Sequence, residues 1–377
     1  MDDFIAFGKP SFGEGEIAAV TRVMQSGWVG MGPETVAFEQ ELAAFLGCPE
    51  VVTVNSCTAA LTLSLRVLGI GPGDEVVCPS LTWCSTANAA LYLGAVPVFA
   101  DVSEDTLCLD PEDVLRAVTP RTRAVIVVHF GGLAADVGAL SAMLPRGCAL
   151  IEDAAHAMCA RYPDGDPVGS SGNLCCFSFY ANKTLSTGEG GAIALAEPAQ
   201  AGRLRSLRQH ALESDAWQRY STGRGRISDL RELGYKANYT DLQAAIGRVQ
   251  LTRQEEFAAR RLEVARYYAR ELDDLGLTFQ RGCTDSRHAR HLFAVRLPET
   301  CRRPRDDIVR DMREAGIGVS VHYPALHPMP LYAQSPRRRL PVTDSVAPRL
   351  LTLPIGPLVG IPEAARVVAT LRRVLAA

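Results

Sequence analysis

The residues with the most evident chemistry lie in three short segments, and the first segment surrounds Lys183. Lysine is rare in this chain, because only Lys9, Lys183 and Lys236 are lysines among 39 basic residues. Lys183 stands in FSFYANKTLSTGEGGAI (177–193), where a loop rich in Ser, Thr and Gly joins two apolar runs. Burial lowers the pKa of a lysine toward the neutral amine that attacks carbonyl groups. The segment favours a nucleophilic or Schiff-base lysine; the alternative is a surface lysine with a packed stem.

The second segment, IEDAAHA (151–157), places carboxylates at the end of an apolar run. Glu152 and Asp153 end the run, and His156 follows three residues later. A carboxylate in this position caps a helix, acts as a general base or holds a protonated ring nitrogen. No metal site is predicted, because Asp153 and His156 supply too few ligands and no further ligand has suitable spacing.

The third segment, NSCTAAL (55–61), joins an apolar run to a helical pattern. Its small residues let a phosphate approach the backbone N–H groups at the positive end of a helix, and Thr58 adds a hydroxyl donor. Helix capping by Ser or Thr explains the same residues equally well. A second glycine-rich segment, GIGPGD (69–74), is interpreted as a turn, because a dinucleotide-binding loop follows a strand and opens a helix, whereas this one does the reverse.

Taken together, the three segments fit one cofactor, pyridoxal 5′-phosphate. This cofactor needs an amine for its aldehyde, a carboxylate for its pyridinium nitrogen, a phosphate site and an aromatic side chain against its ring. The predicted groups are, in that order, Lys183, Asp153, Thr58 with Ser178, and Trp83.

Short apolar runs that alternate with helical patterns must position these residues. Helices are expected over 34–47, 58–69 and 83–94. Continuous apolar strands separated by helices indicate an α/β fold with a mainly parallel sheet covered on both faces. The carboxyl ends of such strands meet at one edge, where ligands bind. The expected strands are 51–55, 75–79, 96–102, 123–130, 148–153, 173–180 and 190–196.

The second half of the chain changes character after a long helical stretch over 240–276, which is read as one helix or as two helices that meet near Thr252. Beyond it, short apolar runs alternate with charged helical segments, which is typical of an α+β unit. One of these runs, GVSV (318–321), is expected to be a strand. We therefore expect a large α/β domain over 1–248, which binds the cofactor, and a small C-terminal α+β domain over 249–377.

Composition excludes several classes of protein. The 377 residues carry a formal charge of −3, which argues against a nucleic-acid partner. No uninterrupted apolar run is long enough for a membrane span. The start of the chain, with its two acidic residues, lacks the features of a signal peptide, so a cytoplasmic location is expected. Eleven cysteines without a CxxC pair are interpreted as reduced core thiols.

The order of the motifs also resembles that of a known family. The chain is similar to the DegT/DnrJ/EryC1/StrS family of pyridoxal phosphate-dependent sugar aminotransferases, which have fold type I. The matching blocks include FGKPSFGEGEIAAV, SGWVGMGPETVAFEQELAAFLG, SCTAAL, IEDAAHA, FSFYANKTLSTGEGG, LGYKANYTDLQAAIG and VHYPALH.

The resemblance implies a role for each matching residue. Lys183 resembles the aldimine lysine and Asp153 the partner of the pyridine nitrogen. Asn238 resembles an asparagine that reaches the phosphate in the neighbouring subunit, which implies a homodimer with shared sites. The remaining positions resemble the residue beside the ring hydroxyl (His156), the stacking aromatic (Trp83) and the phosphate contacts (Cys57, Thr58 and Ser178). Cys57 stands where Gly is common, and Thr184 where Asn is frequent.

The resemblance further implies amino transfer from an amino acid, expected to be glutamate, to a keto carbon of a nucleotide-linked sugar, most similar to 4-keto substrates. His322 and Tyr323, in VHYPALH, are expected to face the substrate or to have a structural role. Two alternatives remain open. One is a keto-cyclitol or another antibiotic precursor as the acceptor, and the other is a regulatory protein that binds the cofactor without turnover.

Overall fold

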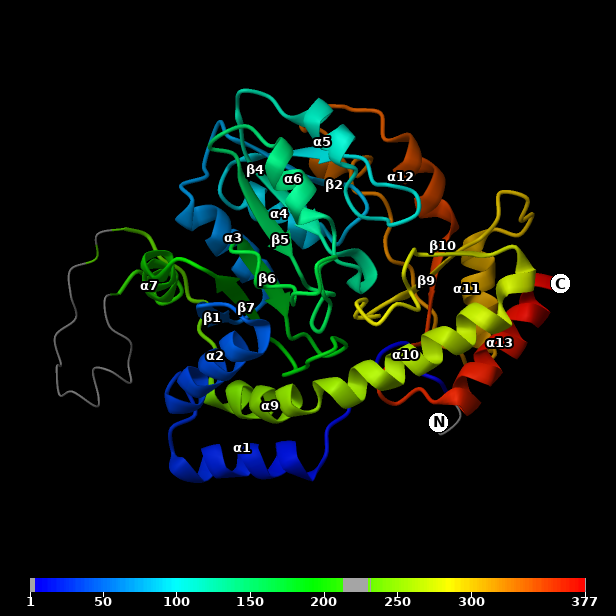
Figure 1. The fold of residues 1–377 in the computed structure, drawn as a ribbon, viewed down its shortest axis with the longest axis horizontal. Helices are drawn as coiled ribbons and strands as arrows, with labels where there is room; N and C mark the ends of the chain where they lie inside the picture. Colours follow the sequence, from blue (N-terminus) through cyan, green and yellow to red (C-terminus); the bar gives the residue numbers. More distant parts are fainter. Residues whose placement is uncertain (1–3, 213–229, 231, 377) are drawn as a thin grey trace.

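The computed structural model describes residues 4–212, 230 and 232–376, and a seven-stranded sheet lies at its centre (Figure 1). The strand order is β1-β7-β6-β5-β4-β2-β3. Neighbours are parallel from β3 through β6, whereas β7 runs antiparallel to both β6 and β1. The prediction of a mainly parallel sheet is confirmed. The strands are β1 (Glu50–Val54), β2 (Glu75–Pro79), β3 (Val96–Ala100), β4 (Thr122–Val128), β5 (Ala149–Asp153), β6 (Leu174–Ser178) and β7 (Gly191–Leu195).

Helices cover both faces of this sheet because its strands are apolar on both faces. Successive strand residues point to opposite faces, so Val52 and Ile193 pack in one core while Val51 and Ala192 pack in another. The first face is covered by α3 (Cys57–Val67), α4 (Cys84–Leu91) and α7 (Pro198–Leu207). The second is covered by α2 (Pro33–Leu46), α5 (Pro111–Ala117), α6 (Val137–Met143) and α9 (Asp241–Thr252).

Two consecutive helices connect this sheet to the C-terminal part of the chain. Helix α9 ends at Thr252, and α10 (Gln254–Glu271) begins after Arg253, so the alternative of two helices that meet near Thr252 is confirmed. Helix α1 (Glu14–Ser26) lies along α9 and packs Ala19 and Val23 against Ala245 (Figure 1).

The C-terminal part has its own sheet and its own core. Strands β8 (Thr278–Phe279), β9 (Phe293–Arg296) and β10 (Leu350–Leu353) form an antiparallel sheet in the order β10-β9-β8. It packs with α10, α11 (Arg305–Glu314) and α13 (Ile361–Ala376). The α+β character is confirmed, whereas the boundary between residues 248 and 249 stays a prediction. The shorter helices are α12 (Pro341–Val346), η1 (Phe130–Gly132), η2 (Asp273–Leu275), η3 (Pro330–Tyr332) and η4 (Ala347–Arg349).

The expectation of a strand at GVSV (318–321) is wrong. Among the described residues, this segment forms one isolated bridge, between Ser320 and Thr352, and Ile317 directly before it forms another with Ile5. Its backbone follows the N-terminal segment so closely that a Cβ on Gly318 would lie 2.8 Å from the nitrogen of Phe7. The segment is thus held by neighbours on two sides and does not extend one regular ladder.

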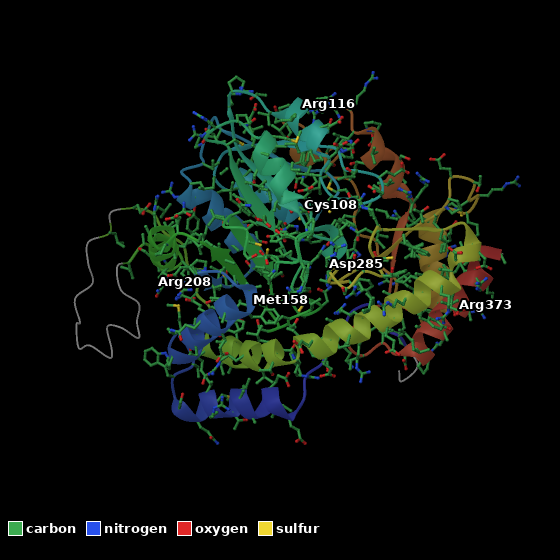
Figure 2. All side chains as sticks on the ribbon, in the orientation of Figure 1. Cys108, Arg116, Met158, Arg208, Asp285 and Arg373 are labelled. Carbon is green, nitrogen blue, oxygen red and sulfur yellow. The ribbon has the colours of Figure 1, made fainter. Side chains whose placement is uncertain are left out.

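A buried ion pair ties β1 to the helices beside it. Arg208, at the end of α7 and labelled in Figure 2, donates to Glu39 of α2 and to the carbonyl of Thr53 in β1. Burial alone raises the pKa of Glu39, but Arg208 and Arg205 together hold it below its ordinary value. This pair fixes the strand from which α3 begins.

The structure also bears on the predictions about the cysteines and about membrane-spanning segments. All eleven cysteines lie in the described part of the chain and carry free thiols. None of the helices over the described ranges combines the length and apolar character that spanning a bilayer requires.

Candidate active site

A cavity of about 500 Å³ lies at the carboxyl ends of the strands, and nine of the ten predicted site residues line it. The strands deliver these side chains directly. Asp153 ends β5, Ser178 ends β6, and α3 follows β1 with Cys57 and Thr58 in its first turn. The remaining predicted residues in the wall are Trp83, His156, Lys183, His322 and Tyr323.

Asp153 is a buried carboxylate held by neutral donors. Thr86 donates to its Oδ2 at 2.8 Å, and the backbone N–H of Ala155 donates to its Oδ1 at 3.2 Å. The Cys57 thiol lies 3.9 Å from the same Oδ1. Burial raises the pKa of Asp153. A cation placed beside this carboxylate would favour its ionised form, so the position suits a protonated ring nitrogen.

Lys183 lies in a tight turn after β6, where its N–H donates to the carbonyl of Tyr180 at 2.9 Å. Its Nζ lies 3.4 Å from Nε2 of His291. Burial lowers the pKa of Lys183 to about 8, even though Cys57 and Asp153 favour its charged form. The pKa is lowered in the direction that the sequence predicts, so that about a tenth of this lysine is the neutral amine at pH 7.

His156 is linked to Tyr323 by a hydrogen bond whose direction can be assigned. The N–H of Gly131 donates to His156 Nδ1 at 3.3 Å, so the ring hydrogen of the neutral imidazole is on Nε2. Burial lowers the pKa of His156 well below its ordinary value, which keeps it neutral. Nε2 therefore donates to the Tyr323 hydroxyl oxygen at 2.9 Å, and the hydroxyl hydrogen of Tyr323 remains for an acceptor in the cavity.

Trp83 and His322 add ring surfaces to the cavity. Trp83 precedes α4 and is 60% exposed, with its ring centre 5.9 Å from that of Tyr323. This openness leaves the indole available for stacking against a planar ligand. His322 stacks on Phe7 and shares a hydrogen bond of 3.0 Å with Thr352. Burial lowers the pKa of His322 to about 3, so it is neutral.

The start of α3 offers donors for an anion. The first N–H groups of a helix have no acceptor within the helix, and Cys57 and Thr58 occupy these positions beside the cavity. Ser56 caps the helix by accepting from the N–H of Ala59 at 3.1 Å, so the capping explanation is confirmed and the phosphate site stays a prediction. Gly191 makes the site compact, because a Cβ there would lie 2.7 Å from the nitrogen of Cys57.

Asn238 is the predicted residue that lies apart from the cavity. It lines a second hollow of about 370 Å³ together with Trp28, Asn55 and Lys236. Its buried Oδ1 has no hydrogen-bond partner among the described residues. Asn55 and Ser56 are adjacent in the chain but line different hollows. The role of Asn238 toward a neighbouring subunit stays a prediction.

Glu152 points away from the cavity and has structural partners. Its carboxylate oxygens accept hydrogen bonds from His129, Tyr162, Ser171 and Asn173. His129 Nδ1 accepts the N–H of Ala135, so the donor to Glu152 is the Nε2–H. Of the two acidic residues in IEDAAHA, only Asp153 reaches the cavity.

Sequence reasoning missed two residues of this site. His291, which contacts Lys183, precedes β9 and is 108 positions away in the chain. Thr86, which orients Asp153, lies inside the predicted helix over 83–94, which the structure shows as α4. Neither has a local signal, because a histidine before a strand and a threonine in a helix are ordinary there. A hydroxyl one turn after Trp83 was the only available indication of Thr86.

The donor set fits pyridoxal phosphate. The cavity brings together a partly neutral buried amine, a buried carboxylate without a cationic hydrogen-bond partner in the described chain, a helix start and an open indole. On this sheet topology, the arrangement is that of a pyridoxal phosphate-dependent enzyme of fold type I.

The particular family follows from comparison with known sequences. The profile of the DegT/DnrJ/EryC1/StrS aminotransferase family matches residues 10–372, and the chain belongs to this family. The spore coat polysaccharide biosynthesis protein SpsC of Bacillus subtilis (strain 168) is 41% identical over 361 residues, which are 94% of this chain and 92% of SpsC.

Solved structures support the same assignment. The pyridoxal phosphate form of Spr1654 from Streptococcus pneumoniae has a TM-score of 0.92 and 28% identity, with 99% of each chain covered. The sugar aminotransferase CalS13 from Micromonospora echinospora has a TM-score of 0.88 and 30% identity, and the match covers 98% of this chain and 99% of CalS13.

Proposed function

We propose that this aminotransferase moves an amino group from L-glutamate to the keto carbon of a nucleotide-linked sugar, with a 4-keto sugar as the leading acceptor. The names of CalS13, a sugar aminotransferase, and SpsC, a polysaccharide biosynthesis protein, support a sugar as the acceptor. The observation that carries the proposal is the presence of Lys183 and Asp153 in one cavity with Trp83 at its wall.

Each of these residues has a defined task. Pyridoxal phosphate, when bound, supplies an aldehyde for the amine and a ring that stabilises negative charge on the substrate carbon. Lys183 supplies the amine that holds this aldehyde and, once released, takes a proton from the substrate carbon and delivers it to the carbon that carried the aldehyde. Asp153 keeps the ring nitrogen protonated. Trp83 orients the ring, and Cys57, Thr58 and Ser178 bind the phosphate.

The part of the cavity wall formed by His322 and Tyr323 is assigned to contact with the substrates. Tyr323 presents its hydroxyl hydrogen, because its oxygen already accepts from His156. His322 offers a neutral ring beside it. Such neutral donors suit sugar hydroxyl or keto oxygens, which carry no charge.

The proposed assembly is a homodimer in which Asn238 of each chain contacts the phosphate bound by the other. The unpartnered Oδ1 of Asn238, in a hollow apart from Lys183, supports this arrangement. The cytoplasmic location stays a prediction.

The first half of the reaction can be tested by absorbance. The purified protein with pyridoxal phosphate should show a near-visible band that collapses on addition of glutamate. Lys183→Ala should lack or alter this band. Lys9→Ala is the matched control, because Lys9 lines a different hollow and should leave the band and its collapse unchanged.

The acceptor requires a second measurement. The glutamate-treated protein is incubated with nucleotide-linked 3-keto and 4-keto sugars and with keto-cyclitols, and mass spectrometry detects replacement of oxygen by an amine. An aminated 4-keto sugar supports the proposal. Amination of a cyclitol alone overturns the sugar acceptor, and binding of the cofactor without any transfer favours a regulatory protein.

A further inference from the structure

His291 is a buried histidine whose only hydrogen-bond partner among the described residues is the amine of Lys183. Its Nε2 lies 3.4 Å from Lys183 Nζ, and 3% of the residue is exposed. Its other ring nitrogen, Nδ1, is buried and has no hydrogen-bond partner in the described chain. One face of the ring lies against His156, with the ring centres 4.6 Å apart. A leucine would fill this buried position without an unpaired nitrogen, so packing alone does not explain the imidazole.

The backbone around His291 is fixed on both sides. The N–H groups of Ala289 and Leu292 donate to the carbonyls of Gly132 and Gly131, at 2.8 and 3.1 Å. These glycines belong to the turn after β4, which also donates to His156. The segment that begins near Asp285, labelled in Figure 2, is thereby attached to the carboxyl edge of the sheet.

This attachment requires unusual backbone at two positions. Gly132 has a φ of +106°, and a Cβ there would lie 2.9 Å from both the nitrogen of Arg290 and the carbonyl oxygen of His156. Arg290, directly before His291, has a φ of 51°, which non-glycine residues rarely adopt. Such conformations persist only where the surrounding structure maintains them, and they concentrate at functional sites.

The protonation states decide what His291 does. Burial, together with the nearby charge of Lys183, keeps the pKa of His291 well below its ordinary value, so the ring is neutral. The ammonium of Lys183 can only donate, so beside it the acceptor nitrogen of the neutral ring is Nε2. His291 thus accepts a charge-assisted hydrogen bond from the Lys183 ammonium.

We propose that His291 is a positioning residue for Lys183: its Nε2 lies against the lysine nitrogen and accepts a hydrogen bond from the ammonium formed when the lysine takes a proton from the substrate. The proton moves from the substrate carbon to Lys183 Nζ, and His291 gains or loses none. The inference rests on the proposed role of Lys183 in amino transfer.

The test measures the Lys183 pKa in the cofactor-free, full-length chain. Acetic anhydride, which reacts with neutral amines, labels the protein from about pH 6 to about pH 11. Mass spectrometry then quantifies acetylation of Lys183 against Lys9 and Lys236, which are the only other lysines. The midpoint of the pH dependence of Lys183 acetylation is expected at about pH 8 in the natural sequence. Because no substrate is used, a wrong acceptor assignment does not affect this result.

Two substitutions separate the proposed role from a packing role. His291→Leu removes the acceptor and should lower the midpoint by roughly one pH unit, because the ammonium loses a hydrogen bond. His291→Gln retains an acceptor near the position of Nε2 and should keep the midpoint near that of the natural sequence. If the leucine variant does not fold, as judged by circular dichroism, His291→Asn replaces it, because the shorter side chain does not reach Lys183.

A pure packing role predicts a different outcome. Loosening of the cavity would admit water and raise the midpoint toward the ordinary lysine value, equally in all variants. The proposal would be overturned by an unchanged or raised midpoint in His291→Leu. Equal shifts of the midpoint in His291→Leu and His291→Gln would also overturn it. In the loaded enzyme, the single-turnover rate with glutamate should fall roughly tenfold in His291→Leu, with little change in the glutamate concentration that gives half-saturation. The His291→Gln variant should retain most of the natural rate.

Discussion

Burial of Lys183 opposes folding at neutral pH, because the folded chain binds the proton on this lysine less tightly than the unfolded chain does. The pKa of Lys183 is lowered from 10.5 to about 8. Below pH 8 both states are protonated, and the folded state bears the full cost of a buried ammonium. Between these two values the unfolded chain carries more protons, so the stability of the folded state rises with pH. The cost disappears above the unfolded value.

We therefore expect Lys183→Met to stabilise the cofactor-free chain at pH 7, by roughly 1–3 kcal/mol. The gain should shrink between pH 8 and 10.5, the two pKa values that bound the window. Urea unfolding at several pH values measures it. Lys9→Met is the control, because Lys9 is exposed and its substitution should change stability little. A gain that does not depend on pH would indicate better packing by methionine and would contradict the electrostatic explanation.

At the scale of elements, the contact between β7 and the start of α3 sets the geometry of the phosphate site. A Cβ on Gly191 would lie 2.7 Å from backbone atoms of Ser56, Cys57 and Phe177. Backbone atoms cannot rotate away as a side chain can, so the helix start has to shift. The N–H groups at that helix start are the ones that we expect to bind the phosphate.

Gly191→Ala should therefore cost about 1–3 kcal/mol of stability and weaken pyridoxal phosphate binding roughly tenfold or more. Equilibrium dialysis and thermal unfolding measure the two effects. Gly202→Ala in α7 is the matched control, since a Cβ there meets no atom within 4 Å and the residue is exposed. Alanine is the better helix former, so that variant should gain roughly 0.5–1 kcal/mol. Equal behaviour of the two variants would refute the close-contact argument.

Local sequence patterns explain which elements and which site residues could be predicted. The seven strands of the large sheet and the helices α2, α3 and α4 have clear apolar runs and glycine ends, so their positions follow from local pattern. Lys183 and Asp153 could be found because each ends or follows such a run. His291 and Thr86 reach the site through tertiary contacts that no local pattern encodes. The strand predicted at GVSV is wrong for the same reason, because the backbone partners of Gly318 and Ser320, which are Ile5 and Thr352, are distant in sequence.

At the scale of the whole molecule, the position of Asn238 makes the proposed dimer testable. The residue lines a hollow different from that of Lys183, with a buried amide oxygen that has no hydrogen-bond partner among the described residues. If each active site combines Lys183 of one chain with Asn238 of the other, defects at these two positions on different chains leave one site intact. Asn238→Asp is nearly isosteric, and its charge should repel a phosphate.

Co-expression of Lys183→Ala and Asn238→Asp chains with different affinity tags allows purification of the mixed dimer. One of its two sites then has both defects and the other has none, so we expect about half the activity of the natural dimer. Each variant alone should be nearly inactive. The control pairs Lys183→Ala with a chain that carries both substitutions, in which no site is intact and activity should stay at the background level. If the first pair is no more active than this control, Asn238 acts within its own chain and the shared-site dimer is wrong.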